Sequence, residues 1–372
     1  MKHCMHPSSS STGMKNTIHV IMLLAVQTMF RTTKVSSFTT ISIGRSLMVH
    51  HHGNKKYHPT RTQFHHNHAQ HEHAVNRKQH RSFTATSTTL KSQQQSYTNK
   101  ILDILDHEPI ITSTKSKTVK LYQAVSTKAK KRNEMQMTIL EGHRLVIDTL
   151  AHKSSRDLYH DVLVSYDALN HPKLGEELSK QLGDLMAMNR NCRVRLAEQN
   201  VINAACDTVT PQGVVALIGI PKPYTYSQST TETKREMKNK FYLILDGISD
   251  PGNVGTLIRS AKATGVEAII LLPNCCDVFN PKAVRSAMGT TFHVPICSFS
   301  SWDECFNVMT TEFGALGEDI FAATMEGSEN SGDKTQSFES IPHYDINWYE
   351  SNSSGKALII GKEVRFRIFS FL

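Results

Sequence analysis

Residues 241–261 constrain the fold more than any other segment, because they predict a strand, a turn and a helix in immediate succession. The apolar run 241–245 indicates a short buried strand. The Asp-Pro-Gly-Asn sequence at 250–253 supplies residue types favoured in turns, and we expect Asn253 to cap the following helix. We expect one helix face to be buried, that of Leu257, Ile258 and Ala261. Such a unit belongs to an α/β fold, in which ligands bind at the C-terminal edge of the sheet.

The chain before this unit also alternates between strand and helix patterns. Strands are expected at 137–140, 161–165 and 214–218, and helices at 143–150 and around 174–185. These elements predict a first α/β domain at 115–222. Residues 223–238 are rich in Ser, Thr and alternating charges, so they indicate a linker to a second domain at 239–372.

The net positive charge comes from the first hundred residues. Residues 1–100 hold 13 lysines and arginines and one acid, Glu72, whereas the rest of the chain holds 29 basic and 32 acidic residues. A basic Ser- and Thr-rich segment that is nearly free of acids is typical of organelle transit peptides. We therefore expect residues 1–114 to form a disordered, basic targeting region. The remainder must bind any RNA through local basic patches.

An apolar run at 18–26 leaves open which organelle the N-terminal segment would direct the protein to. It has the length of a signal-peptide core and is too short to span a membrane, so we expect no membrane partner. Followed by small residues and Phe38, it resembles a bipartite plastid presequence; a mitochondrial presequence is the competing interpretation, and disorder without an address is the third. We predict a plastid or mitochondrial location.

Cysteine and histidine spacing does not indicate a metal site. The seven cysteines contain no C-x-x-C pair, and 13 of the 20 histidines lie before residue 81 in low-complexity runs. We therefore expect no bound metal.

The segment 246–261 resembles motif 1 of the SpoU/TrmH family of RNA ribose 2′-O-methyltransferases, which belongs to the SPOUT superfamily. The family pattern is Asp-x-x-x-Asp-Pro-x-Asn-x-Gly-x-x-x-Arg-x-Ala. Its fixed positions are filled by Asp246, Asp250, Pro251, Asn253, Gly255, Arg259 and Ala261. A match of this length is a specific signal.

The resemblance continues downstream of motif 1. Residues 265–271 are similar to the family's second strand, 282–292 to its K-A-x-R-x-S-x-G-A helix and turn, 294–296 to the next strand, 320–324 to a strand end beside the cofactor, and 357–363 to motif 2. Lys362 stands where the family has Asn, and 364–372 match nothing in motif 3. We therefore expect an incomplete trefoil knot in a truncated catalytic domain, and we interpret 364–372 as translated intron.

The resemblance implies the function. It implies methyl transfer from S-adenosylmethionine to a ribose 2′-hydroxyl of organellar rRNA or tRNA, by a homodimer. It implies catalytic roles for Arg259, Asn253 and Glu363, and cofactor contacts for Ala323, Thr324 and Gly361. Because a guanidinium group normally stays charged, a positional role for the arginine is easier to defend than a role as a base.

The first domain is similar to the L30e-like substrate-binding domain of many SpoU/TrmH enzymes. Its basic run, with Lys128, Lys130, Lys131 and Arg132, is a candidate for phosphate contacts, although such runs are often solvated helix ends. Two further interpretations of the chain stay open: a catalytically inactive RNA-binding paralogue, and an unrelated nucleotide-binding α/β enzyme. The chain lacks the G-x-G-x-x-G fingerprint that this last interpretation would favour.

Overall fold

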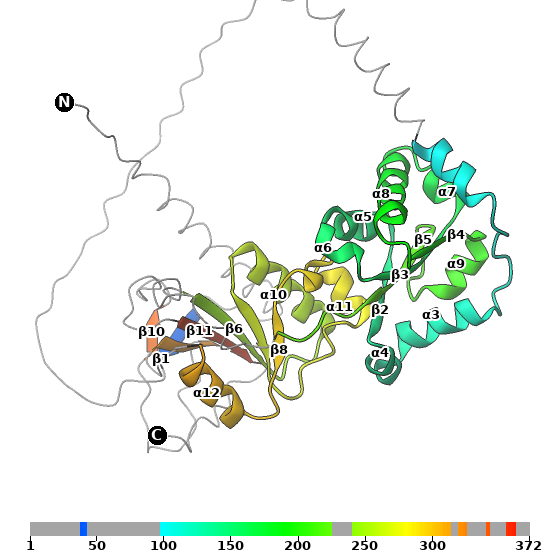
Figure 1. The fold of residues 1–372 in the computed structure, drawn as a ribbon. Helices are drawn as coiled ribbons and strands as arrows, with labels where there is room; N and C mark the ends of the chain where they lie inside the picture. The colour runs from blue at the N-terminus through cyan, green and yellow to red at the C-terminus, as the bar shows by residue number, and fades with distance from the viewer. Residues whose placement is uncertain are drawn as a thin grey trace, which may run out of the picture.

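The structure is a computed structural model that describes residues 38–42, 97–224, 240–313, 319–325, 340–342 and 355–361. The predictions for the rest of the targeting region, for the linker from residue 225 and for Glu363 concern residues outside these ranges. Within them the chain forms two α/β units, each built on its own sheet (Figure 1).

The first unit is a four-stranded sheet with helices on both faces. Its elements are α3 (Lys117–Thr127), α4 (Ala129–Met135), β2 (Met137–Glu141), α5 (His143–Ala151), α6 (Lys153–Arg156), β3 (Tyr159–Val164), α7 (Tyr166–Leu169), α8 (Gly175–Met188), β4 (Arg193–Leu196), α9 (Gln199–Ala205) and β5 (Val214–Gly219). The strand order is β2-β5-β3-β4, and only β3 and β4 are parallel. Two apolar clusters cover its faces, one under α5 and α8 and the other under α3 and α9.

This unit begins earlier than the sequence predicted. Residues 97–105 are helical, and Ile101 and Leu105 are 2% and 3% exposed within the cluster under α8. Thr98 Oγ1 lies 2.9 Å from a carboxylate oxygen of Glu176 in α8. Residues 97–114 therefore belong to the folded domain, because apolar side chains four positions apart share one buried helix face.

The second unit contains a seven-stranded sheet. Its elements are β1 (Phe38–Ser42), β6 (Lys240–Asp246), α10 (Pro251–Ala263), β7 (Ala268–Leu271), α11 (Pro281–Ser286), the 3₁₀ turn η1 (Thr290–Phe292), β8 (Ile296–Ser298), α12 (Trp302–Thr311), β9 (Ile320–Met325), β10 (Ser340–Pro342) and β11 (Gly355–Gly361). The order is β10-β1-β9-β11-β6-β7-β8, and the five strands from β9 to β8 run parallel. The predicted α/β class with a parallel sheet is confirmed.

Alternating burial along β6 explains the layers of this unit. Tyr242 and Ile244 face the cluster under α12, whereas Leu243 and Leu245 face the cluster under α10. Both faces are covered, as parallel sheets require. Strands β1, β4 and β10 were not predicted; β1, from the expected targeting region, pairs antiparallel with β9 and β10.

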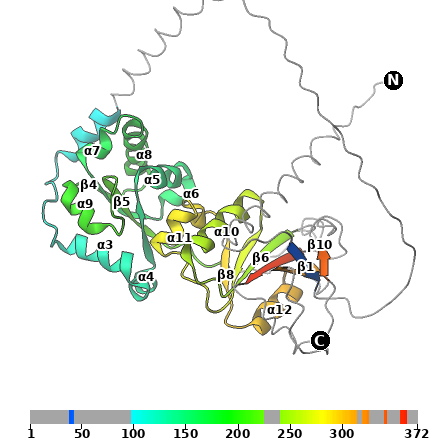
Figure 2. The same cartoon turned by 180° about the vertical axis from the view of Figure 1, so that it is seen from behind.

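The two units are packed against each other through α11 and the chain around it. Figures 1 and 2 both place α10 and α11 between the seven-stranded sheet and the first unit. Val284 and Phe292, from the second unit, belong to the buried cluster under α5 and α8 of the first.

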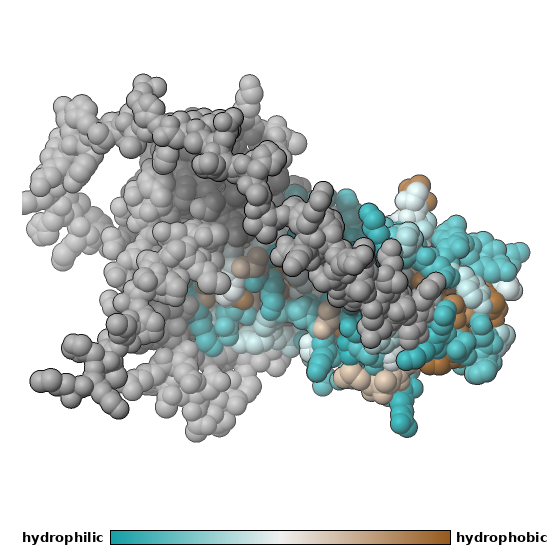
Figure 3. All heavy atoms as spheres, turned by 90° about the horizontal axis from the view of Figure 1, so that it is seen from above, coloured by the Kyte–Doolittle hydropathy of each residue, from teal (hydrophilic) through white to brown (hydrophobic). Residues whose placement is uncertain are grey.

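The surface of the described residues is mostly hydrophilic on the face in Figure 3, with hydrophobic patches that are small and separated. In the ranges that the structure describes, no helix is long and apolar enough to cross a membrane.

Candidate functional site

The turn between β6 and α10 is shaped by Asp250 and Pro251. Asp250 Oδ1 accepts a hydrogen bond of 2.9 Å from the Asn253 backbone N–H, and Pro251 occupies the first helical position. Asp250 is therefore the helix cap, and our prediction that Asn253 caps α10 is wrong. The left-handed residue of this turn is Gly247, at φ +64°.

Gly255 sets how closely α10 and α11 approach. A Cβ atom on Gly255 would lie 2.4 Å from the Ala283 carbonyl oxygen and 2.5 Å from Ser286 Cβ. No other residue type fits between the helices without displacing backbone. The Ser286 hydroxyl also donates a 2.7 Å hydrogen bond to the Gly252 carbonyl, which ties α11 to the turn.

Arg259 lies on the exposed face of α10, one turn beyond Gly255. The opposite face is buried as predicted, with Leu257, Ile258 and Ala261 at most 1% exposed. Across the described ranges no residue forms a hydrogen bond or ion pair with the Arg259 side chain. Its guanidinium is therefore available to an anion. Asn253, at the start of the same helix, is half-buried.

Three parallel strands bring further predicted residues to the same edge of the sheet. Asp246 at the end of β6 pairs in register with Gly361 at the end of β11, and Ala323 lies near the end of the adjacent β9. Burial raises the pKa of Asp246, and a hydrogen bond from the Trp302 side chain offsets part of that rise. Thr324 follows Ala323 in the β9 backbone.

The predicted RNA-binding run divides into two groups. Lys128 and Lys130 are exposed, and Lys131 forms an ion pair of 3.0 Å with Glu134. Arg132 is 2% exposed, and its Nε donates a 2.7 Å hydrogen bond to Asp277 of the second unit. The prediction of a phosphate contact by Arg132 is therefore wrong, because its charge is already paired within the domain interface.

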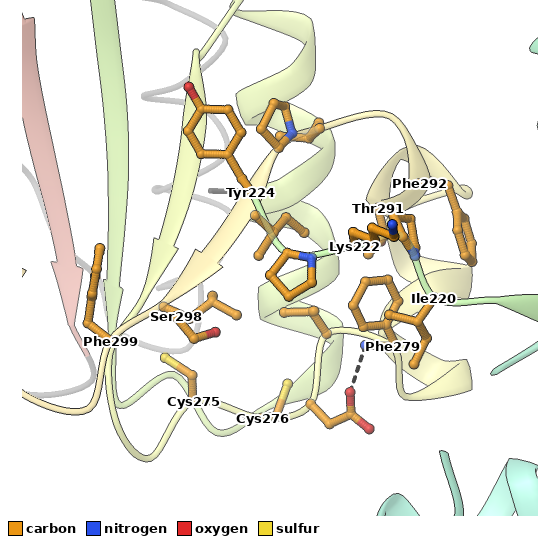
Figure 4. A pocket seen from close by; sticks show the side chains of 18 of the residues that line it. Ile220, Lys222, Tyr224, Cys275, Cys276, Phe279, Thr291, Phe292, Ser298 and Phe299 are labelled. Atoms are coloured by element: carbon orange, nitrogen blue, oxygen red, sulfur yellow. Dashed lines mark hydrogen bonds between the residues drawn. The ribbon is translucent and has the colours of Figure 1, made fainter. Parts of the chain in front are cut away.

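A cavity of about 690 Å³ lies elsewhere, alongside β8. The segment 220–224, the loop after β7 and the chain around β8 form its walls, and Figure 4 shows Cys275, Cys276 and Ser298 along one side. None of the predicted site residues lines it. The candidate site is thus the sheet edge beside α10; the cavity lies alongside β8 and reaches that edge through the loop after β7, in which the Cys276 N–H donates to the Ile248 carbonyl.

Within the described part of the chain, no three His, Cys, Asp or Glu side chains are grouped closely enough to hold a metal ion. The predicted site residues of the described chain supply a guanidinium and an amide on α10, and small residues beside the Asp246 carboxylate at the strand ends.

Known proteins share this organisation. Residues 240–365 match the model of the SpoU rRNA Methylase family. The chain is 29% identical over 226 residues to the protein named rRNA methyltransferase 3, mitochondrial, of Xenopus tropicalis, covering 60% of this chain and 49% of that one. It is 28% identical over 186 residues to the protein named 23S rRNA (guanosine(2553)-2′-O)-methyltransferase RlmP of Bacillus subtilis, covering 50% and 63%. The chain thus spans less than two thirds of the length of these relatives.

The fold is also found in solved structures. An rRNA methyltransferase from Sinorhizobium meliloti aligns with a TM-score of 0.52 at 22% identity, over 70% of this chain and 84% of that one. A second structure of an rRNA methyltransferase from that organism, described as AdoMet bound, aligns with a TM-score of 0.50. These alignments support the two-unit α/β arrangement.

Proposed function

Because residues 240–365 match the model of the SpoU rRNA Methylase family, we propose that the chain methylates ribose 2′-hydroxyl groups of rRNA or tRNA. The observation that carries the proposal is the β6–turn–α10 unit, which begins at the C-terminal edge of a parallel sheet and carries Arg259 on the exposed face of α10, without a hydrogen-bond or ion-pair partner among the described residues. The relative named RlmP supports the ribose 2′-oxygen as the acceptor.

The strand ends fit S-adenosylmethionine as the methyl donor. Gly361 and Ala323 are small residues at the strand ends, which suits a close approach of a ligand to the backbone, and Asp246 supplies a carboxylate at the same edge. When bound, the cofactor supplies the electrophilic methyl group. We assign Ala323, Thr324 and Gly361 to its pocket.

Arg259 would act by position and charge. A guanidinium stays protonated in proteins, so it suits the phosphate next to the reacting ribose and would orient the 2′-hydroxyl. Asn253 would contact the substrate from the first turn of the same helix. Glu363 is proposed to support Arg259 from the chain that follows β11.

The first unit is proposed to be an L30e-like RNA-binding domain. Lys128 is the N-cap residue of α4, and Lys130 and Lys131 lie in its first turn; Lys128 and Lys130 are exposed to RNA phosphates, and Lys131 would have to exchange its partner Glu134 for one. We further propose a homodimer in an organelle. Relatives whose names carry the word mitochondrial support the mitochondrion, and a plastid is the alternative.

The test is methyl transfer from tritiated S-adenosylmethionine to deproteinised rRNA, followed by mass spectrometry of the nucleosides. A version of the chain with a family-like sequence after Glu363 should yield 2′-O-methylnucleosides. Arg259→Ala should lower kcat by about 100-fold, because it removes charge stabilisation at the reacting ribose. Arg144→Ala is the matched control, since Arg144 is an exposed cation on α5. RNA binding without methyl transfer would contradict the proposal and identify an RNA-binding paralogue instead.

A further inference from the structure

Residues 276–293, here called the bridging segment, form hydrogen bonds and ion pairs with several side chains of the first unit. Thr138 donates a 2.6 Å hydrogen bond to the Phe279 carbonyl oxygen, and Ser155 Oγ lies 3.3 Å from His293 Nδ1. Further contacts join Arg132 to Asp277 at 2.7 Å and Glu141 to Arg285 at 3.0 Å. Among the described residues, these contacts between the two units all fall on this one short stretch of the second unit.

The bridging segment also holds the motif 1 turn. The backbone N–H of Cys276 donates to the Ile248 carbonyl at 2.9 Å, and Ser286 Oγ donates to the Gly252 carbonyl at 2.7 Å. Gly255 leaves no gap between α10 and α11. A displacement of α11 must therefore carry α10 with it, because close-packed elements do not slip past each other freely.

The contact between Glu141 and Arg285 fixes the position of Arg285 relative to the first unit. The Glu141 side chain is 3% exposed, and one carboxylate oxygen accepts from Arg285 while the other accepts from the Asp207 backbone N–H at 2.8 Å. A buried carboxylate that is bonded on both oxygens has one defined position. Arg285 thus points to the first unit, whereas its neighbour Ser286 points to the motif 1 turn.

We propose that Arg285 and Ser286 are positioning residues that couple RNA binding by the first unit to the placement of Asn253 and Arg259. The proposal rests on the proposed function. When RNA binding shifts the first unit, Glu141 moves and its ion-pair partner Arg285 moves with it. Ser286, the next residue, then shifts the motif 1 turn into the position in which Asn253 and Arg259 contact the substrate. Neither residue needs to touch substrate or cofactor.

Ser286→Ala is the first test. It should lower kcat for methylation of deproteinised rRNA about 10-fold, with the RNA dissociation constant and the KM for S-adenosylmethionine unchanged. Thr310→Ala is the matched control, since it removes a similar hydroxyl-to-carbonyl hydrogen bond, of 2.9 Å, within α12. A merely structural role would lower the melting temperature of Ser286→Ala and leave kcat unchanged below the transition, which would overturn the proposal.

The second test does not depend on turnover. Amide hydrogen exchange at 248–254 should slow when deproteinised rRNA binds the wild-type chain. Arg285→Lys keeps the charge but loses the planar fork, and it should abolish this response while RNA still binds. A response that persists in Arg285→Lys and Ser286→Ala overturns the coupling. If the wild-type chain shows the response but transfers no methyl group, only the proposed activity fails; if it binds no RNA, both fail.

Discussion

The structure explains why particular residue types occupy the α10 turn, which the sequence pattern alone does not show. Gly255 fits the motif because α11 backbone occupies the space where a side chain would lie. We therefore expect Gly255→Ala to lower the free energy of unfolding by about 2–3 kcal/mol, the usual cost of overpacking. Urea unfolding measures this, and Gly183→Ala is the control, since a Cβ there meets no atom within 4 Å. Equal destabilisation by both changes would contradict this explanation.

Residue types alone could not decide the cap of α10. Asp250 and Asn253 are both good capping residues, and only the fixed φ of Pro251 places the first helical position directly after Asp250. Arg132 shows the same limit. Sequence shows its charge, but its partner Asp277 is 145 positions away.

At the scale of elements, α10 should depend on its cap. Asp250→Ala removes the acceptor for the Asn253 N–H, so we expect a loss of about 1 kcal/mol in the free energy of unfolding. Asp250→Asn keeps an acceptor oxygen and should lose less. Thermal unfolding separates the two, and equal losses would show that the ion pair with Lys282, at 3.5 Å, matters more than the cap.

The main strands and helices were predictable because their apolar periodicity is local. Strands β2, β3, β5 and β6 and helices α5 and α8 lie within a few residues of their expected bounds. β8 begins two residues later than expected. Strands β1, β4 and β10 were missed, since a strand of three to five residues carries little periodicity of its own and is defined by partners elsewhere in the chain.

At the scale of the whole molecule, the domain interface should be sensitive to acid. The ring of His293 packs against that of His152, with centroids 3.9 Å apart and the planes tilted by 35°, and Lys262 donates to the His293 carbonyl. Burial, His152 and Lys262 lower the pKa of His293 to about 4. The unfolded chain therefore binds more protons than the folded chain between about pH 6.5 and pH 4. The stability that this group contributes is complete above that window and is lost as the pH falls through it.

We expect the melting temperature to fall from pH 7 to pH 5 in the wild-type chain and to fall less in His293→Asn. The same change at the exposed His107 is the control. An identical pH dependence in wild type and His293→Asn would contradict the assignment.

The first hundred residues set a further prediction for the whole chain. Fused to a fluorescent protein, residues 1–100 should direct it to mitochondria or plastids, because they are basic and carry a single acid. A diffuse cytosolic signal would count against this address.

The position of β11 has a consequence for biosynthesis. This strand, residues 355–361, lies between β6 and β9 and pairs with both, although β6 begins at residue 240. While the chain is being translated, the strand position between β6 and β9 stays unfilled until residue 361 has left the ribosome. We therefore expect the first unit to fold early and the second to stay exposed to chaperones, with a slow final step set by these long-range pairings.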